Sequence, residues 1–180
     1  VKILLAAALC TTASLPARAA LPPENPFAAP SALPYSLPPF DRIKAEHFIP
    51  AFEAGMAAQR AEVSAITSNT EAPTFDNTIV PLERSGRLLS RVSRAFYNLN
   101  SANTSEALQK IDTEMAPRLT AHGDAISMDP RLCDRIRAIH GRLGSPGLDD
   151  ESAQLVRRYY RQFARSGALL GEARKKELKQ

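Results

Sequence analysis

The chain has 180 residues, 44% of them hydrophobic and 23% charged, and its formal net charge is +4. This length is enough to bury one core, so one soluble domain is the default interpretation. The 23 basic and 19 acidic residues are interspersed, which excludes a block of like charge and indicates no particular class of partner.

Residues 1–19 have the pattern of a secretory signal peptide. Lys2 precedes the apolar run ILLAAALC, and the segment ends in Ala17-Arg18-Ala19, an A-x-A cleavage pattern. The run is far shorter than the roughly 20 residues that span a bilayer, and no later segment is long and apolar enough. We therefore predict an exported protein without a membrane anchor, with the periplasm as the expected compartment.

Cleavage at this site would lower the net charge from +4 to +2, because the segment carries two basic residues and no acidic one. It would also leave Cys133 as the one cysteine, which excludes an intrachain disulfide. A lipid anchor on Cys10 is the alternative, but Leu9 stands where signal processing favours a small residue.

Residues 20–42 contain seven prolines, which exclude a helix and favour extended or polyproline geometry. We interpret this segment as an arm. Five side chains could lay it over a folded surface: Phe27, Leu33, Tyr35, Leu37 and Phe40. A flexible linker is the equal alternative on composition alone.

A helical period begins after the arm and predicts a first helix over about residues 47–68, with Pro50 near its start. Its apolar face consists of Phe48, Phe52, Met56, Val63 and Ile66. Glu46 and His47 lie beside the start of this helix, and a glutamate next to a histidine at such a place could belong to the metal site of a zinc peptidase. However, H-E-x-x-H would need a histidine at Ala51, so we expect this pair to cap or flank the helix.

The second predicted helix gives the strongest helical signal. Thr74 is its N-cap, and apolar residues follow at spacings of three and four: Ile79, Leu82, Gly86, Leu89, Val92, Phe96 and Leu99. Pro81 lies inside the pattern, so we expect a kink there or regular hydrogen bonding only after it. Gly86 on the buried stripe predicts a close approach between helices.

The third helix begins near Ser105 and carries Pro117 as an expected kink. Its apolar face consists of Leu108, Ile111, Met115, Leu119, His122 and Ile126. The fourth helix begins at Asp129-Pro130, an N-cap followed by proline at the first helical position. Its apolar face consists of Leu132, Ile136, Ile139 and Leu143.

The fifth helix begins near Asp149, stops at Gly167, and should bury Leu155, Tyr159 and Phe163. No strand pattern appears. The sequence therefore predicts an all-α fold of antiparallel helices with short loops over residues 43–180. The final GEARKKELKQ opens another helical stretch that has barely begun when the chain ends, so we expect a truncated piece of a larger protein.

Two other groups of residues suggest chemistry. A metal site of His122, Cys133 and His140 would depend wholly on tertiary folding, and His122 is better explained as a core histidine with one satisfied hydrogen bond. The segment RRYYRQFARSG interleaves tyrosines with arginines, which is typical of nucleic-acid binding. We expect instead that Arg157, Arg158, Arg161 and Arg165 form a solvated face.

Five stretches carry a resemblance, and they cover the chain from about residue 33 to its end: LPYSLPPFDRIKAEHFIPAFEAGM, PTFDNTIVPLERSGRLLSRV, NLNSANTSE, EMAPRLTAHGDAI and YYRQFARSGALL. In this order they resemble the amino-terminal region of bacterial dipeptidyl carboxypeptidases, relatives of thimet oligopeptidase. None of them is a catalytic motif.

The resemblance implies a zinc metallopeptidase, almost entirely helical, whose two lobes face each other across a deep substrate channel. Such enzymes release dipeptides from the carboxyl ends of short peptides. Zinc is held there by the histidines of H-E-x-x-H and a later glutamate. None of those residues is in this sequence, so we assign no catalytic or metal residue, and the substrate-binding residues remain unknown. The resemblance places the chain in a lobe that forms part of the channel wall.

Two hypotheses are therefore open. In the first, the chain is the exported amino-terminal part of such a peptidase; its partners are short peptides and the catalytic half, and alone it is inactive and binds no zinc. In the second, it is a free-standing helical module that binds peptides or a protein. Both exclude nucleic acid as a partner, and the first predicts apolar stripes left exposed without the catalytic half.

Overall fold

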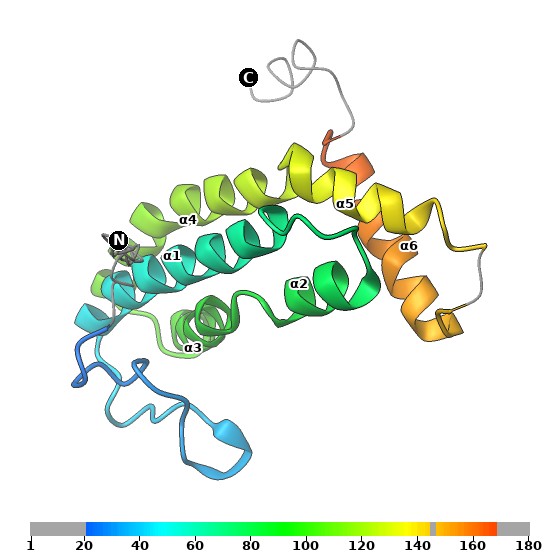
Figure 1. Cartoon of the computed structure of the whole chain (residues 1–180). Helices are drawn as coiled ribbons and strands as arrows, with labels where there is room; N and C mark the ends of the chain where they lie inside the picture. The colour runs from blue at the N-terminus through cyan, green and yellow to red at the C-terminus, as the bar shows by residue number, and fades with distance from the viewer. Residues whose placement is uncertain (1–20, 145–146, 169–180) are drawn as a thin grey trace, which may run out of the picture.

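A computed structural model describes residues 21–144 and 147–168 (Figure 1). Its helices are α1 (Phe48–Thr67), α2 (Val80–Arg84), α3 (Arg87–Ala102), α4 (Glu106–Ser127), α5 (Pro130–His140) and α6 (Asp150–Arg165). Short helical turns cover Pro34–Ser36, Ala45–His47 and Phe75–Ile79. These described residues contain no strand, which confirms the all-α prediction. The predicted signal peptide and the final GEARKKELKQ lie outside them.

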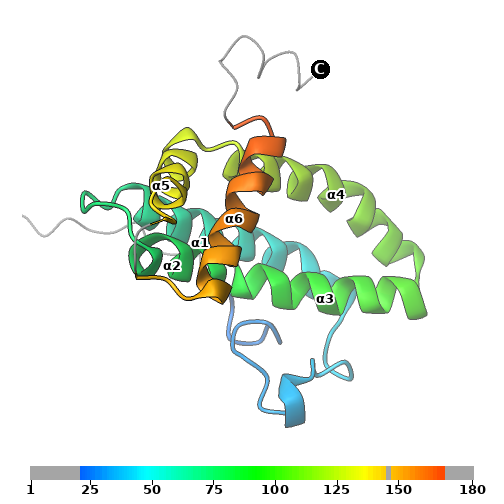
Figure 2. The same cartoon turned by 90° about the vertical axis from the view of Figure 1, so that its right-hand side faces the viewer.

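Helix α1 is the centre of the fold. It packs against α3 on one side and α4 on the other, and α3 runs antiparallel to both, so that α1 and α4 run parallel (Figure 1). Helices α5 and α6 pack against each other near the carboxyl-terminal end of α1, on the opposite side of the molecule from the arm. Figure 2 shows the molecule from that side. No helix in the described part of the chain is long and apolar enough to cross a membrane.

The first half of α1 belongs to an aromatic cluster. Phe48 packs against Phe27 of the arm and Phe96 of α3, with ring centroids 5.6 and 5.0 Å away. Phe52 also meets Phe96 at 5.4 Å. Helix α4 adds Leu108, Ile111 and Met115 to this cluster. Because these side chains recur every three or four residues, one face of each helix is buried, as the sequence predicts.

The second half of α1 belongs to an aliphatic cluster with the carboxyl-terminal helices. Its buried members come from α1, the turn and helix that follow it, α5 and α6: Val63, Ile66, Ile79, Leu82, Leu132, Cys133, Ile136, Ile139, Val156, Phe163 and Ala168. The described residues thus form two hydrophobic clusters along one central helix, rather than the single core that chain length suggests.

Three helix starts agree with the sequence. Ser105 accepts a hydrogen bond from the Leu108 N–H, Asp129 accepts from the N–H groups of Arg131 and Leu132, and Asp149 accepts from the Ser152 N–H. Each side chain satisfies backbone donors that the first helical turn leaves without partners. Gly167 has a φ of 85°, the left-handed conformation expected of a helix terminator.

The prediction of one helix after Thr74 is wrong. Thr74 does cap the segment by accepting from the Asn77 N–H, but a π-helical turn follows, then α2, and the chain breaks before α3. The break lies at Gly86, whose φ is 69°, and not at Pro81, which sits in the first turn of α2 where its missing N–H costs nothing. Helix α4, by contrast, continues through Pro117 as one element.

The predicted face of α6 is also only partly correct. Phe163 is buried, but Leu155 and Tyr159 are half-buried, while Val156 has no exposed surface and Ala153 is buried. The buried stripe is therefore rotated from the predicted one. The tyrosine is large enough to reach the edge of the cluster and place its hydroxyl outside it.

The first part of the arm is packed against the helices, whereas the later part is exposed. Phe27 is buried in the aromatic cluster, and the Asn25 side-chain amide donates to the His47 carbonyl. In the part of the arm after residue 30, the large exposed hydrophobic side chains are Leu33, Tyr35, Leu37 and Phe40. These four make up most of the large exposed hydrophobic residues of the described chain, so the expectation of exposed helical stripes is not met.

Candidate functional site

The Glu46-His47 pair flanks α1, as predicted. The imidazole Nδ1 of His47 accepts a hydrogen bond from the Lys44 N–H at 3.0 Å, which closes the short helical turn before α1. Glu46 lies on the surface, 3.9 Å from the Lys44 ammonium group. Both side chains therefore have local structural partners at a helix start.

The candidate metal ligands His122, Cys133 and His140 have different surroundings. His122 lies between α4 and α1, Cys133 is buried in the aliphatic cluster, and His140 stacks on Tyr160 with ring centroids 4.0 Å apart. Over residues 21–144 and 147–168 no three His, Cys, Asp or Glu side chains come together in a way that could hold a metal ion. The described residues do not fit the zinc site that the resemblance implies for the family.

The four arginines of α6 are exposed, which confirms the solvated face. Arg157, Arg158, Arg161 and Arg165 all lie on the outer side of the helix, whereas Phe163 faces the aliphatic cluster. Tyr159 is committed to another contact, because its hydroxyl donates to Glu83 at 2.7 Å. The tyrosines are thus not free platforms for stacked bases.

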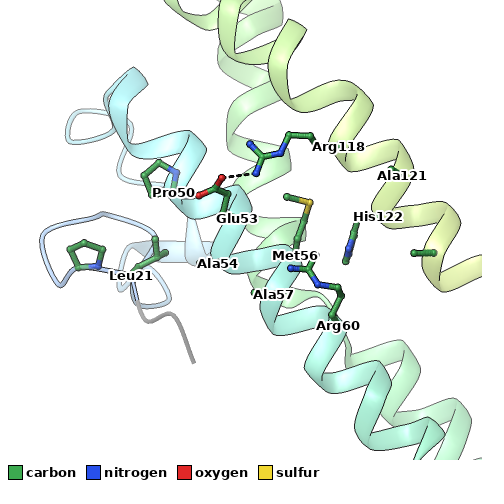
Figure 3. Close-up of a pocket in the computed structure, with 12 residues that line it drawn as sticks. Leu21, Pro50, Glu53, Ala54, Met56, Ala57, Arg60, Arg118, Ala121 and His122 are labelled. Carbon is green, nitrogen blue, oxygen red and sulfur yellow. Dashed lines mark hydrogen bonds and ion pairs between the residues drawn. The ribbon is translucent and has the colours of Figure 1, made fainter. Parts of the chain in front are cut away.

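A groove of about 750 Å³ lies between α1 and α4 (Figure 3). We call it the α1–α4 groove. Leu21 and Pro22 of the arm and Pro50 at the start of α1 line part of it. The rest of its apolar lining is made of alanines and one methionine: Ala54, Met56, Ala57, Ala121 and Ala125. Because the alanine side chains are small, they leave the space between the two parallel helices unfilled.

An ion pair lies across the groove. Arg118 of α4 donates to Glu53 of α1 at 2.5 Å and also contacts Glu114 at 3.3 Å (Figure 3). Both partners of the bridge between helices are well exposed, so it contributes little stability. It places a polar rim beside the apolar floor of the groove.

His122 forms the buried polar part of this groove, and its surroundings confirm the core histidine prediction. Its Nε2 lies 2.8 Å from Oε1 of Gln59, whereas its Nδ1 is buried without a partner. Burial, and then the nearby positive charge of Arg60, lower the pKa of His122. The neutral ring with Nε2–H donating to Gln59 fits this arrangement. Because Nδ1 is out of contact with solvent, it is not placed to act as a general base.

Gln59 and Glu62 were not recognised from sequence. Both lie on α1 between the two clusters, and Glu62 accepts a hydrogen bond from the Gly86 N–H at 2.7 Å. A Cβ atom on Gly86 would lie 2.4 Å from the Gln59 amide nitrogen, so Gly86 lies close to a side chain of α1 and not, as predicted, at a close approach of two helices. Gly55 makes a close approach to the Leu89 backbone. Two polar residues inside an otherwise apolar helix face are the only sequence signal for this junction.

A second groove, of about 640 Å³, separates the arm from α3. We call it the arm–α3 groove. It is lined by Tyr35, Leu37 and Phe40 on the arm and by arginines on α3. The loop of the arm stands off from α3 in both Figure 1 and Figure 2.

Comparison with known proteins gives a consistent result. No family model matches the sequence. The chain is 41% identical over 155 residues to the dipeptidyl carboxypeptidases of Escherichia coli and of Salmonella typhimurium, which covers 86% of the chain and 23% of each relative. It is 26% identical over 133 residues to oligopeptidase A of Salmonella typhimurium, covering 74% of the chain and 20% of that relative. The chain thus spans about a quarter of the length of these curated relatives.

Proposed function

Because the chain belongs, as a segment, to the peptidase family of dipeptidyl carboxypeptidase and oligopeptidase A, we propose that it confines peptides in an exported dipeptidyl carboxypeptidase. It would form part of the channel wall, while zinc and the catalytic residues would come from elsewhere in the enzyme. Similarity over 86% of the chain is the observation that carries this proposal. The described residues bring no three potential metal ligands together, so zinc would be held by residues outside them.

The α1–α4 groove is the surface that suits this role best. Its small apolar side chains leave room for the side chains of a peptide, and Glu53, Arg60 and Arg118 at its rim can contact polar groups of the peptide backbone. The groove is open to solvent along one side, as expected for a surface that forms one wall of a channel. A peptide held there would be oriented for a reaction whose chemical groups lie outside this chain.

The activity is tested with an N-acetylated tetrapeptide and mass spectrometry of the products. We expect the full-length enzyme containing this chain to release the carboxyl-terminal dipeptide, and a zinc chelator to abolish the release. The 180-residue chain alone should release nothing. Release of single amino acids by the full-length enzyme would contradict the proposed dipeptidyl carboxypeptidase activity, and cleavage by the isolated chain would contradict confinement without catalysis.

The wall itself is tested by filling the groove. Ala121→Trp places a large side chain in the groove from an exposed position, so it should raise the KM of the full-length enzyme several-fold while folding is preserved. Ala116→Trp, equally exposed on α4 but outside the groove, is the matched control and should leave KM unchanged. Equal effects of the two substitutions would contradict a role for the α1–α4 groove.

A free-standing module that binds peptides or a protein is the second candidate. One observation favours it: the described residues cover two hydrophobic clusters among themselves, with few large apolar side chains exposed on the helices. A module of this kind should bind a peptide without cleaving it and should melt in one cooperative transition. Calorimetry of the chain with and without the acetylated tetrapeptide distinguishes this candidate, because it predicts peptide binding by the isolated chain.

A further inference from the structure

The two walls of the arm–α3 groove differ in chemistry. The arm contributes Tyr35, Leu37 and Phe40, which are 97%, 53% and 41% exposed. Helix α3 contributes Arg87 and Arg94, which are exposed, and Arg91, which is half-buried. One side of the groove is therefore apolar and aromatic, and the other side is cationic.

The positive charge on α3 is not neutralised by the described residues. Within residues 21–144 and 147–168, none of these three arginines forms an ion pair. Arg91 donates to the Phe27 carbonyl at 2.9 Å, and its Nε is buried without a partner. The carboxylate among the described groove residues is Glu83, and it already accepts from the Tyr159 hydroxyl. The groove thus presents unpaired cations to whatever enters it.

The spacing of these cations suits an extended polypeptide. Consecutive arginines are three or four residues apart, so they lie on one face of α3, about 4.5 and 6 Å apart along its axis. Alternate residues of an extended chain are about 6.6 Å apart and point to one side, while those between them point to the other. A strand in the groove would turn one set of side chains toward the arginines and the other toward the arm.

We propose that the arm–α3 groove binds an extended segment of another polypeptide in which acidic and apolar residues alternate. Carboxylates would pair with Arg87, Arg91 and Arg94, and the apolar residues would cover Leu37 and Phe40. Tyr35 and Phe40 suit either bases or apolar side chains, whereas Leu37 and Pro38 between them offer no stacking surface to bases, which favours a polypeptide over a nucleic acid. This inference goes beyond the peptidase assignment and does not rest on it, because it concerns recognition without cleavage.

Fluorescence anisotropy with the 180-residue chain tests the proposal. The probes are a labelled decapeptide of alternating leucine and aspartate, the same peptide with asparagine for aspartate, and a labelled ten-nucleotide oligothymidine. We expect the aspartate peptide to bind most tightly. The double variant Arg87→Gln/Arg94→Gln should weaken this binding about five-fold, since each exposed charge contributes modestly. Leu37→Ser should weaken the binding of both decapeptides.

A matched control separates the groove from general charge attraction. Arg157→Gln/Arg161→Gln removes two exposed arginines from α6, so it lowers the net charge equally without touching the groove. This variant should bind the aspartate peptide like the wild type. Absent binding of the aspartate peptide, equal affinity for the two decapeptides, or equal loss in the two double variants would overturn the proposal. Tighter binding of the oligonucleotide would make this a nucleic-acid site instead. None of these outcomes depends on dipeptide release.

Discussion

The two hydrophobic clusters share α1 but are held together differently. The aromatic cluster is built from phenylalanine rings in tilted and edge-to-face contact, with apolar residues from α3 and α4 around them. The aliphatic cluster lies beside two buried polar residues, Thr78 and Arg135. Asn25 and His122 are buried at the aromatic end as well, so the difference between the ends lies in the guanidinium of Arg135, which joins several segments at the aliphatic end.

Arg135 explains the difference. It donates to Thr78 Oγ1 at 3.1 Å, to Asn77 Oδ1 at 2.9 Å and to the Asn69 carbonyl at 2.8 Å, with a longer contact to the Glu71 carbonyl. One guanidinium thus fixes the connection between α1 and α2 against α5. Its acceptors are neutral, so its charge is buried among dipoles rather than beside a carboxylate.

The largest expected effect is the loss of an aromatic ring. Phe96→Ala removes a side chain that contacts both Phe48 and Phe52, and should lower the free energy of unfolding by about 4 kcal/mol through lost burial and a residual cavity. Urea denaturation followed by circular dichroism measures this. Tyr97→Ala, next along the helix and 45% exposed, is the control and should cost far less. Equal losses would show that the cluster is not the main core.

The second effect tests the polar end. Arg135→Met keeps an unbranched apolar stem but leaves the Asn69 carbonyl and the Thr78 hydroxyl without their donor, so it should cost about 3 kcal/mol. Arg137→Met on the same helix removes an exposed arginine paired with Asp134, and should cost under about 1 kcal/mol. If both variants unfold at the same urea concentration, the hydrogen bonds of Arg135 contribute nothing to stability.

Local patterns predicted one part of this structure well. The N-caps at Ser105, Asp129 and Asp149 were predictable because a cap depends on a few neighbouring residues. The role of Arg135 was not: its spacing from Leu132 and Ile139 places it on the buried face, but the sequence does not show which groups accept its hydrogen bonds. Its role arises only when a distant turn brings backbone carbonyls to it.

The break between α2 and α3 was missed for a related reason. The apolar stripe continues from Leu82 to Val92, so the sequence pattern reads as one helix, although these two residues enter different clusters. The break is set by the left-handed Gly86 and its hydrogen bond to Glu62, a contact between segments 24 residues apart. For the candidate site, likewise, the sequence predicted the buried His122 but not its partner Gln59, nor either groove.

Two glycines sharpen the comparison at the junction between the clusters. Gly86→Ala forces a side chain into a backbone with φ of 69° and toward Gln59, so it should cost about 1 kcal/mol or more. Gly123→Ala lies in α4 with open space around its Cβ position and should stabilise by about 0.5–1 kcal/mol. Urea denaturation of the two variants should therefore give shifts of opposite sign, and shifts of one sign would show that Gly86 is not the junction.

The smallest effect is a pH dependence that belongs to the aromatic end of the molecule. His122 lines the α1–α4 groove together with Met56, and its pKa is lowered by burial and then by Arg60. The unfolded chain binds a proton at His122 near the ordinary pKa of about 6.5, before the folded protein does. The stability contributed by the neutral ring is therefore present above that pH and is lost as the pH falls.

His122→Leu should remove this dependence. Between about pH 7.5 and 5.5 the wild type should lose more stability than the variant, because only the wild type has a buried ring that must stay unprotonated. Arg60→Gln removes the smaller of the two causes, so it should weaken the dependence only in part. Parallel stability curves for the wild type and His122→Leu would mean that the ring takes up a proton without disturbing the fold. The unpartnered Nδ1 would then have to find an acceptor for its new N–H, which requires the α1–α4 groove to rearrange.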